Sequence, residues 1–372
     1  MRWISCLLVP ITSIGLGACR RSCDGDACTC NCTCGCPPSD DTGPDTGETG
    51  ETGETGDTGD TDYLDGGAWV WAKSTPAGSG YTWNLDEDFH LPGYTVPSLL
   101  VLHGGAGYRM FLTSQLDRGS IYLARSADGL SWTVDPVAIL RPDDFAGACG
   151  PELLDVSQVY LPDGSYRLLV EGYDQPRNVS TLCSAWSADG DSWAAEEGVR
   201  YAGSEEDCGT TSVAGVVWYR PLAAWLVFYV GDWCSPDGNA VRAAISTDGW
   251  NFEPWITTNI LPQHRVDPEP VLIDGADGLR LYHSIWQRGH PGLAESPDAV
   301  TFTDLGDLPN LDDNSYHGGE TPQPGDACMF DPSYLRLPDG RAFLYFSYFE
   351  TDGAGQTSAG IRRASADDVA AP

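Results

Sequence analysis

A short motif with the pattern Ser-x-Asp-x-x-x-aromatic recurs along this chain. It reads SADGLSW at 126–132, SADGDSW at 187–193, STDGWNF at 246–252 and SPDAVTF at 296–302, and a shortened form, SADD, stands at 365–368. The five copies begin 61, 59, 50 and 69 residues apart. Recurrence at this spacing is typical of a fold assembled from repeated structural units. We therefore expect five similar units.

Each copy lies in a longer unit of short apolar segments separated by tight turns. The second unit begins at Gly150 with an apolar run, a Pro-Asp-Gly turn and an alternating run, and a third run, TLCSAWS, leads into the motif. Four short strands joined by tight turns are what a β-propeller blade requires, and helical periodicity is nearly absent. The sequence predicts an all-β, five-bladed propeller over residues 67–368, with four antiparallel strands per blade.

The last unit breaks off at SADDVAAP, without a fourth strand. A segment near the start of the domain, SGYTWNLDED around Trp83, resembles the strand that follows the motif in the first unit. We predict that residues 80–90 supply the outer strand of the last blade. This N-terminal strand would close the ring and remove the exposed edges of an open set of blades.

The recurring motif has the composition of a structural turn. Its Ser and Asp side chains can bond to nearby backbone, its Gly accepts a positive φ, and its Trp or Phe is a large apolar group suited to packing. Five copies in five equivalent places cannot all be catalytic, so we interpret the motif as part of the fold.

The first 66 residues differ in composition from the rest. Residues 1–18, MRWISCLLVPITSIGLGA, have a basic start and an apolar stretch of signal-peptide length, and the LGAC ending at Cys19 resembles a bacterial lipobox. That resemblance implies lipidation of Cys19 and a lipoprotein exported to the outer membrane or cell surface, in contact with the membrane through its N-terminal lipid. A plain secretory signal is the alternative.

Two further segments separate this signal from the domain. Residues 19–36 contain seven cysteines, and behind an export signal such a density favours short disulfide-bonded knots over zinc. Residues 37–66 form an acidic tract rich in Thr, Gly, Asp and Glu. Its carboxylates repel one another and it cannot bury a core, so we expect a disordered linker.

Charge and residue spacing narrow the possible ligands. The formal net charge is −34, from 54 acidic and 20 basic residues, which argues against nucleic acid because phosphate binding needs a basic surface. His264, His283 and His290 are not at a recognisable metal-binding spacing. We predict no metal and no cofactor.

Carboxylates stand near the expected starts of the inner strands, which converge on the axis of a propeller. We place these starts at Val96-Pro97, Gly150-Pro151-Glu152, Cys208-Gly209, Asp267-Pro268-Glu269 and Asp331-Pro332. The catalytic candidates are Asp267, Asp331, Glu152 and Glu206, because several carboxyls around one cavity are the arrangement that glycoside hydrolysis requires. For each aspartate alone, a role in the turn is the alternative.

Loops expected at the same end of the propeller supply candidates for substrate binding. Trp233 and Trp286 are candidates for stacking on sugar rings, and Arg288 and His290 for polar contacts; the alternative is that the tryptophans belong to the core. Glu269, at an inner-strand start, is a further candidate for substrate binding. Cysteines at that end bracket the first two strands of a blade, which suggests the disulfides Cys149–Cys183 and Cys208–Cys234 and leaves Cys328 over.

Taken together, residues 67–368 resemble the five-bladed propeller glycosidases, the group that contains glycoside hydrolase families 43, 32 and 68. The resemblance rests on DPSYLRLPDGRAFLYFS, DPEPVLIDGADGLRLYHS, GPELLDVSQVYLPDGSYRLLVE and the repeated turns. It implies three essential carboxylates at inner-strand starts: a base or nucleophile, a helper aspartate and a glutamate acid. The first blade departs from this pattern, with Val96-Pro97 where these enzymes carry the catalytic aspartate.

Three functions are considered from these observations. The first is a surface-anchored glycoside hydrolase of oligo- or polysaccharides, with Glu206 or Glu152 as the acid and Asp331 or Asp267 as the base or helper. The alternative is a non-catalytic propeller that binds carbohydrate or protein, which the missing first-blade aspartate favours. A purely structural role in the cell envelope is a third possibility.

Overall fold

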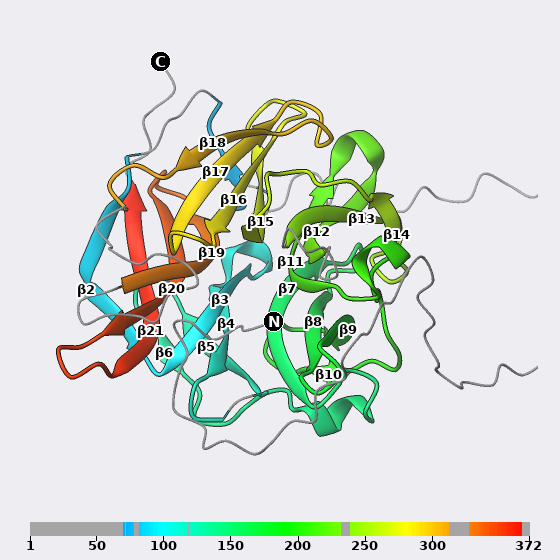
Figure 1. Ribbon diagram of the computed structural model, residues 1–372, viewed down its shortest axis with the longest axis horizontal. Coiled ribbons are helices and arrows are strands. Elements are labelled where there is room, and N and C mark those ends of the chain that lie inside the picture. The colour runs from blue at the N-terminus through cyan, green and yellow to red at the C-terminus, as the bar shows by residue number, and fades with distance from the viewer. Residues whose placement is uncertain are drawn as a thin grey trace, which may run out of the picture. The chain divides into compact units, whose positions relative to one another are not determined.

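Five antiparallel sheets surround a common axis in the computed structural model of the chain (Figure 1). The structure describes residues 70, 72–77, 82–117, 119–231, 239–311 and 327–366. The sheets follow one another along the chain, and each contains four antiparallel strands. The predicted all-β, five-bladed propeller is therefore confirmed. Residues 1–18, 19–36 and 37–66 lie outside the described residues, so the signal peptide, the cysteine-rich segment and the linker stay predictions.

The blades have the following strands, from the axis outward. Blade one contains β3 (Tyr94–Val101), β4 (Tyr108–Ser114), β5 (Ile121–Ser126) and β6 (Thr133–Val134); blade two contains β7 (Glu152–Tyr160), β8 (Tyr166–Asp174), β9 (Val179–Ser187) and β10 (Ala194–Ala195); blade three contains β11 (Ser212–Tyr219), β12 (Ala224–Gly231), β13 (Ala240–Ser246) and β14 (Glu253–Ile256). Blade four contains β15 (Arg265–Ile273), β16 (Leu279–Ile285), β17 (His290–Ser296) and β18 (Thr303–Asp307); blade five contains β19 (Ala327–Arg336), β20 (Ala342–Thr351), β21 (Thr357–Ala366) and β2 (Asn84–Pro92).

Short elements complete the chain. A two-residue strand, β1 (Ser74–Thr75), pairs in parallel with β15, and the 3₁₀ turns η1 (His103–Gly105), η2 (Pro142–Phe145), η3 (Glu205–Asp207) and η4 (Arg220–Leu222) lie in the loops. In the described part of the chain, no helix is long and apolar enough to cross a membrane.

The ring is closed by a strand from the start of the domain. β2 pairs with β21 as the outer strand of blade five, with Asn84 opposite Ser365 and Pro92 opposite Gly360. The predicted closure is confirmed. Trp83, just before β2, is fully buried and meets Tyr282 of blade four edge-on, with ring centroids 6.0 Å apart. The closing segment thus supplies the fifth blade with the aromatic residue that its shortened motif lacks.

The repeated motif is a turn that fastens each blade to the one before it. In the four complete copies the Ser Oγ donates to the Asp Oδ1 at 2.8–3.0 Å, and that oxygen accepts two backbone N–H groups two and three residues further on. Trp193 packs on Phe111 of blade one, and Phe302 packs on Phe228 of blade three. The motif is therefore structural.

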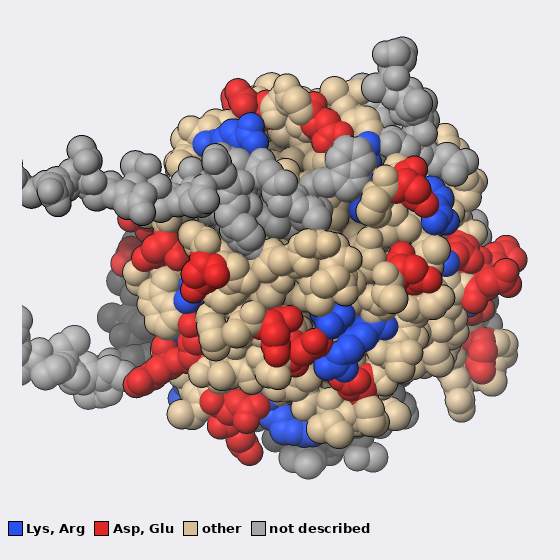
Figure 2. Space-filling view, turned by 180° about the vertical axis from the view of Figure 1, so that it is seen from behind, with Lys and Arg blue, Asp and Glu red and all other residues tan. Residues whose placement is uncertain are grey.

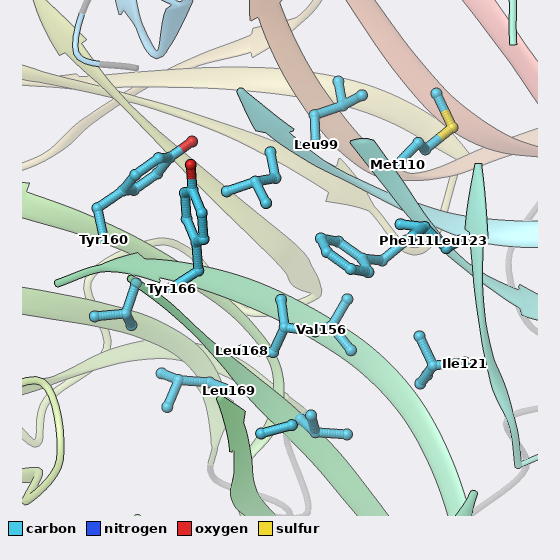
Figure 3. Packing of buried hydrophobic residues seen from close by; sticks show 14 of the residues in the cluster. Leu99, Met110, Phe111, Ile121, Leu123, Val156, Tyr160, Tyr166, Leu168 and Leu169 are labelled. Atoms are coloured by element: carbon cyan, nitrogen blue, oxygen red, sulfur yellow. The ribbon is translucent and has the colours of Figure 1, made fainter. Parts of the chain in front are cut away.

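Apolar side chains fill the spaces between blades. Between blades one and two, Leu99 and Phe111 pack in one cluster with Val156 and Leu168 (Figure 3). Tyr160 ties the two blades further, since its hydroxyl accepts the backbone N–H of Val101 at 3.0 Å. Full burial of one such side chain contributes about 1.5–3 kcal/mol, so these interfaces hold the inner strands at fixed positions around the axis.

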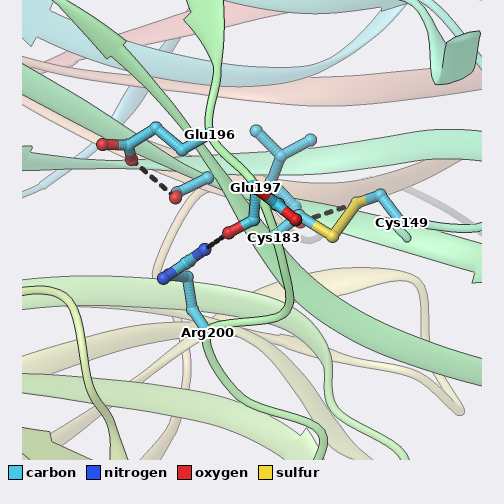
Figure 4. Close-up of a disulfide and its surroundings, with 7 residues drawn as sticks. Cys149, Cys183, Glu196, Glu197 and Arg200 are labelled. Carbon is cyan, nitrogen blue, oxygen red and sulfur yellow. Dashed lines mark hydrogen bonds between the residues drawn. A yellow bond between two sulfur atoms is a disulfide. The ribbon is translucent and has the colours of Figure 1, made fainter. Parts of the chain in front are cut away.

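A disulfide fixes the loop that leads into blade two. Cys149 and Cys183 are bonded, with their Cα atoms 5.7 Å apart, as the sequence predicted (Figure 4). Closing a loop of this length stabilises a fold by about 3–4 kcal/mol. Cys208 is disulfide-bonded as well, and its expected partner Cys234 lies outside the described residues. Cys328, which spacing had left over, is also disulfide-bonded.

Candidate functional site

Every inner strand is interrupted by a β-bulge close to its start. The pairing with the second strand shifts between Thr95 and Ser98, Leu153 and Val156, Ser212 and Gly215, Val266 and Glu269, and Phe330 and Ser333. A bulge bends its strand and redirects the side chains that it carries. Val96, Asp267 and Asp331 occupy equivalent bulges and share a positive φ of 54–56°.

In three blades the bulge lies at the residues that the sequence predicted as the start of the inner strand. In the other two it lies elsewhere. Prolines mark the bulges of blades one, four and five, as expected. In blade two the bulge is at Leu154–Asp155 rather than at Glu152, and in blade three at Val213–Ala214 rather than at Cys208–Gly209. β7 begins at Glu152, as predicted, but in both blades the residues that line the cavity are those at the bulge further along the strand, and not those at its start.

The bulges line one small cavity. Its lining contains residues of all five blades: Val96, Pro97, Ser98, Asp155, Val156, Ser157, Ala214, Asp267, Pro268, Glu269, Asp331, Pro332 and Ser333. The cavity has a volume of about 30 Å³, which is room for roughly one water molecule. Four of the lining residues carry carboxyl groups, so acids from blades two, four and five converge at this point.

Asp267 is one of two predicted catalytic residues found at the cavity. It is 5% exposed, and its Oδ2 accepts the backbone N–H of Asp331 at 3.3 Å. Burial raises the pKa of Asp267 to about 6, against the opposing effect of hydrogen bonds from Ser284 and from the Asp331 backbone. Asp267 therefore titrates near neutral pH instead of near pH 4.

Asp331 is the second predicted catalytic residue at the cavity, and it is more exposed to solvent than Asp267. Its Oδ2 accepts the hydroxyl of Ser347 at 2.5 Å, and that hydroxyl oxygen in turn accepts the backbone N–H of Val96 at 2.7 Å. Desolvation raises the pKa of Asp331 well above its usual value, and the neighbouring charge of Asp267 raises it further. This carboxyl keeps its proton more readily than an ordinary aspartate.

Two acids of the cluster were missed by sequence analysis. Asp155, in the bulge of β7, is 7% exposed, and burial followed by the charge of Glu171 raises its pKa well above the usual value. Glu171, on β8, is 1% exposed and accepts the hydroxyls of Ser180 and Ser212 at 2.7 and 2.8 Å. The available signal was an acid that directly adjoins apolar residues inside each strand, at ELLDV and LLVEG.

Glu269, predicted to bind substrate, lines the same cavity. Its Oε1 accepts the backbone N–H of Tyr334 at 3.1 Å, which links blades four and five. The same oxygen is ion-paired with Nζ of Lys73, and the two side chains are 15% and 13% exposed. Glu269 is therefore held between two blades and the segment that precedes β1.

Glu152 and Glu206 are not among the residues that line the cavity. Glu206 is exposed on η3, and hydrogen bonds from its own backbone N–H and from Ser204 lower its pKa, which is the reverse of what a general acid needs. Its neighbour Asp207 is fully buried and accepts hydrogen bonds from Arg242 at 2.6 Å and from the Tyr229 hydroxyl at 2.8 Å. This part of the loop has a structural role.

The predicted loop residues have different surroundings. Trp286 is partly buried and packs against Val266 and Phe330, the residues directly before Asp267 and Asp331. Arg288 is exposed and ion-paired with Asp307. His290 is buried at the start of β17, and Trp233 lies outside the described residues.

Two surface properties bear on possible ligands. Among the described residues, no group of three or more His, Cys, Asp or Glu side chains is placed to hold a metal ion. On the face seen in Figure 2, basic side chains gather in small groups beside acidic ones.

The same fold occurs in solved glycoside hydrolases. A family 43 β-xylosidase/α-arabinofuranosidase from a compost microbial metagenome, solved in complex with xylotriose, is similar with a TM-score of 0.55 and 13% identity, over 78% of this chain and 95% of that one. A thermostable family 43 glycoside hydrolase gives 0.54 and 12% identity, over 78% and 92%. RS223-β-xylosidase gives 0.53 and 11% identity, over 74% and 92%. At these identities the likeness establishes the fold.

The sequence itself gives no family. No family model matches the chain, and no curated protein sequence matches it.

Proposed function

We propose that the propeller hydrolyses glycosidic bonds of an oligo- or polysaccharide at the axial cavity. The observation that carries this proposal is that Asp155, Asp267 and Asp331, from three different blades, meet there with raised pKa values. Glycoside hydrolysis needs one carboxyl that holds a proton and another that is ionised. Crowding of buried carboxyls produces such a division. The glycoside hydrolase fold of the similar structures supports the same class of reaction.

Asp331 is our candidate general acid. It is partly exposed, and it retains its proton at higher pH than an ordinary aspartate does. A sugar bound over the cavity would place its glycosidic oxygen near this carboxyl, and the exposed part of Trp286 offers an aromatic surface for stacking next to it.

Asp267 is our candidate base. With a pKa of about 6 it is mostly ionised at pH 7, and it can accept a proton from water. The cavity of about 30 Å³ beside it has room for one water molecule. Asp155 interacts electrostatically with both aspartates, so it influences how protons are shared among the three.

The proposal is tested by measuring product release. Purified full-length chain is incubated with a panel of oligo- and polysaccharides, starting with xylotriose, the sugar bound in one of the similar structures. We expect cleavage by the wild type and none by Asp331→Asn or Asp267→Asn. Glu152→Gln and Glu206→Gln are matched controls, since these acids lie away from the cavity, and both should cleave normally. Cleavage that survives both aspartate substitutions contradicts the proposal.

A second candidate function is glycan binding without cleavage, which Val96 favours. The resemblance to the propeller glycosidases implies a catalytic aspartate in the first blade, and the bulge of that blade holds Val96. A binding protein would retain one glycan of the panel without releasing product. Trp286→Ala would then abolish retention, whereas Asp331→Asn would leave it unchanged.

We also propose that the chain is exported and lipidated at Cys19. The disulfide Cys149–Cys183 supports export, because disulfides persist in oxidising compartments. In bacteria that express the chain with labelled palmitate, we expect label in the wild type and none in Cys19→Ala. A labelled variant, or an unlabelled wild type that is secreted, contradicts lipidation at this residue.

A further inference from the structure

Lys73 is the single lysine of the chain, and it lies next to the axial cavity. It directly precedes β1, which pairs in parallel with β15, the innermost strand of blade four. β1 lies on the side of β15 opposite β16, the side that faces the axis. The strand therefore extends blade four inward, beyond the four strands that the repeat provides.

The β1 segment is held firmly in this position. The backbone oxygen of Lys73 accepts the N–H of Leu272 at 2.9 Å, and Arg280 donates to the Thr75 hydroxyl at 2.6 Å. Ser74 and Thr75 are 3% and 0% exposed, and the hydroxyl of Tyr334 donates to the Ser74 carbonyl at 3.1 Å. These contacts involve both blade four and blade five, so the segment is part of the folded domain.

Lys73 brings a positive charge to the carboxyls of the cavity. In the described part of the chain, it is the only basic side chain that an ion pair joins to a carboxylate lining the cavity. Asp267 and Asp331 receive hydrogen bonds from serine hydroxyls and a backbone amide, which supply no full positive charge. In a small cavity with four carboxyls, one ammonium changes the balance of like charges substantially.

We propose that Lys73 is a positioning residue of the axial site, whose ammonium offsets the charge of Glu269 and holds that carboxylate between blades four and five. The N-terminal strand β1 is then an integral part of the site. The activity readout below rests on the proposed hydrolysis, so a second readout that needs no substrate accompanies it.

The first experiment compares Lys73→Met with Lys73→Arg in the full-length chain. Loss of the positive charge makes every nearby carboxyl hold its proton more tightly, so the base becomes ionised only at higher pH. We expect the acid limb of the pH–rate profile to shift upward by about 0.5–1 pH unit in Lys73→Met, and to remain in place in Lys73→Arg. An unshifted limb in Lys73→Met, or an equal shift in both variants, overturns the proposal.

The second experiment measures the accessibility of Lys73 with an amine-acylating reagent. Because the chain has one lysine, peptide mass spectrometry after chymotryptic digestion reports on this amine alone. We expect acylation in the folded chain to be at least about tenfold slower than in urea, since the ammonium is largely buried and ion-paired. Equal rates in both states overturn the placement of Lys73.

The two readouts separate the two proposals. If no glycan is cleaved, the hydrolase proposal fails, and the thermal midpoint of Lys73→Met replaces the activity profile. The midpoint should then lie below that of the wild type at pH 7, and the difference should shrink near pH 4, where carboxylates take up protons. The same difference at both pH values indicates lost packing instead of lost charge, and overturns the proposed role.

Discussion

Each blade has an outer turn, formed by the repeated motif, and a bulge in its inner strand. The same residue types return in the turns, whereas the residues in the bulges change from blade to blade. The complete turns repeat Ser, Asp and an aromatic residue in blade after blade. Each inner strand has a bulge, but the bulges carry Val96, Leu154–Asp155, Val213–Ala214, Asp267 and Asp331. Of these residues, Val96, Asp267 and Asp331 have a positive φ. Both sets occur once in each blade, so the difference in residues reflects what each side chain meets.

Each outer turn meets the preceding blade, so the same residues solve the same packing problem every time. The bulges all face one cavity, where each side chain meets those of the other blades. Five aspartates there would place five like charges in about 30 Å³. Recurrence thus indicates a role in folding, and divergence at equivalent positions indicates the site.

The largest expected effect comes from a bulge. If the propeller hydrolyses glycans as proposed, Asp331→Asn should lower kcat about 10³-fold, because asparagine has no acidic proton to transfer. Stability above pH 6 should be unchanged or higher, since the amide removes a buried carboxyl that is costly to ionise. Steady-state kinetics and urea unfolding measure the two quantities. If the free energy of unfolding fell by as much as the activation free energy rose, Asp331 would have a structural role, as the residues of the turns do.

The aromatic residue that completes the fifth turn gives the opposite result. Trp83→Ala should lower the free energy of unfolding by about 3–5 kcal/mol, because it removes a fully buried indole that meets the stacked rings of Tyr282 and Tyr334 edge-on. Urea unfolding measures the loss, and the kcat of the protein that remains folded should stay within about twofold of wild type. A folded variant that is stable but inactive would contradict the division between turns and bulges.

The charge of the bulges also predicts how stability depends on pH. Burial raises the pKa of Asp267 from 3.8 to about 6, so the folded state binds this proton more tightly than the unfolded chain. Below about pH 4 the protonated Asp267 therefore makes its full contribution to the free energy of unfolding. This contribution, about 3 kcal/mol, is lost as the pH rises to about 6. In Asp267→Asn the decrease should be smaller by that amount, measured by urea unfolding at pH 4 and pH 7. An identical pH dependence in both proteins would show that Asp267 is not desolvated.

This contrast explains what sequence analysis could and could not predict. Recurring turns revealed the number of blades, and the incomplete last unit led to the closing strand at residues 80–90. Asp267 and Asp331 were found because Asp-Pro marks their bulges. Asp155 was missed because its bulge has no proline, while Gly150-Pro151 attracted the prediction to Glu152, outside the cavity.

Other site residues depend on contacts between distant segments. Glu171 lies on a second strand, and its place in the cluster follows from Ser212 of the next blade. Lys73 joins the site through a parallel pairing that spans almost 200 residues of sequence, which no local pattern records. Local signals thus predict the repeated parts of a propeller, whereas its axis is defined by tertiary contacts.

A smaller effect is expected from the turn glycines. Gly190 has a φ of 77°, and a Cβ there would lie 2.5 Å from Cδ2 of Leu102 in blade one. Gly190→Ala should lower the free energy of unfolding by about 2 kcal/mol, through backbone strain and overpacking. Gly164→Ala is the control, because Gly164 has a φ of 85° and open space around it. Equal losses in both variants would show that the contact between blades adds nothing to the backbone strain.

The smallest expected change in the free energy of unfolding concerns Ala299, and its sign shows whether backbone strain or packing is the larger effect there. The turn of blade four has Ala299 where the other complete turns have glycine, and this alanine has a φ of 60° and is fully buried. Ala299→Gly removes about 1–2 kcal/mol of left-handed strain but also a buried methyl group worth about 0.8 kcal/mol. We expect a net gain of about 0.5 kcal/mol in the free energy of unfolding, with activity unchanged. A loss of stability would mean that the methyl group packs against blade three well enough to outweigh the strain, so that the alanine of this turn serves packing.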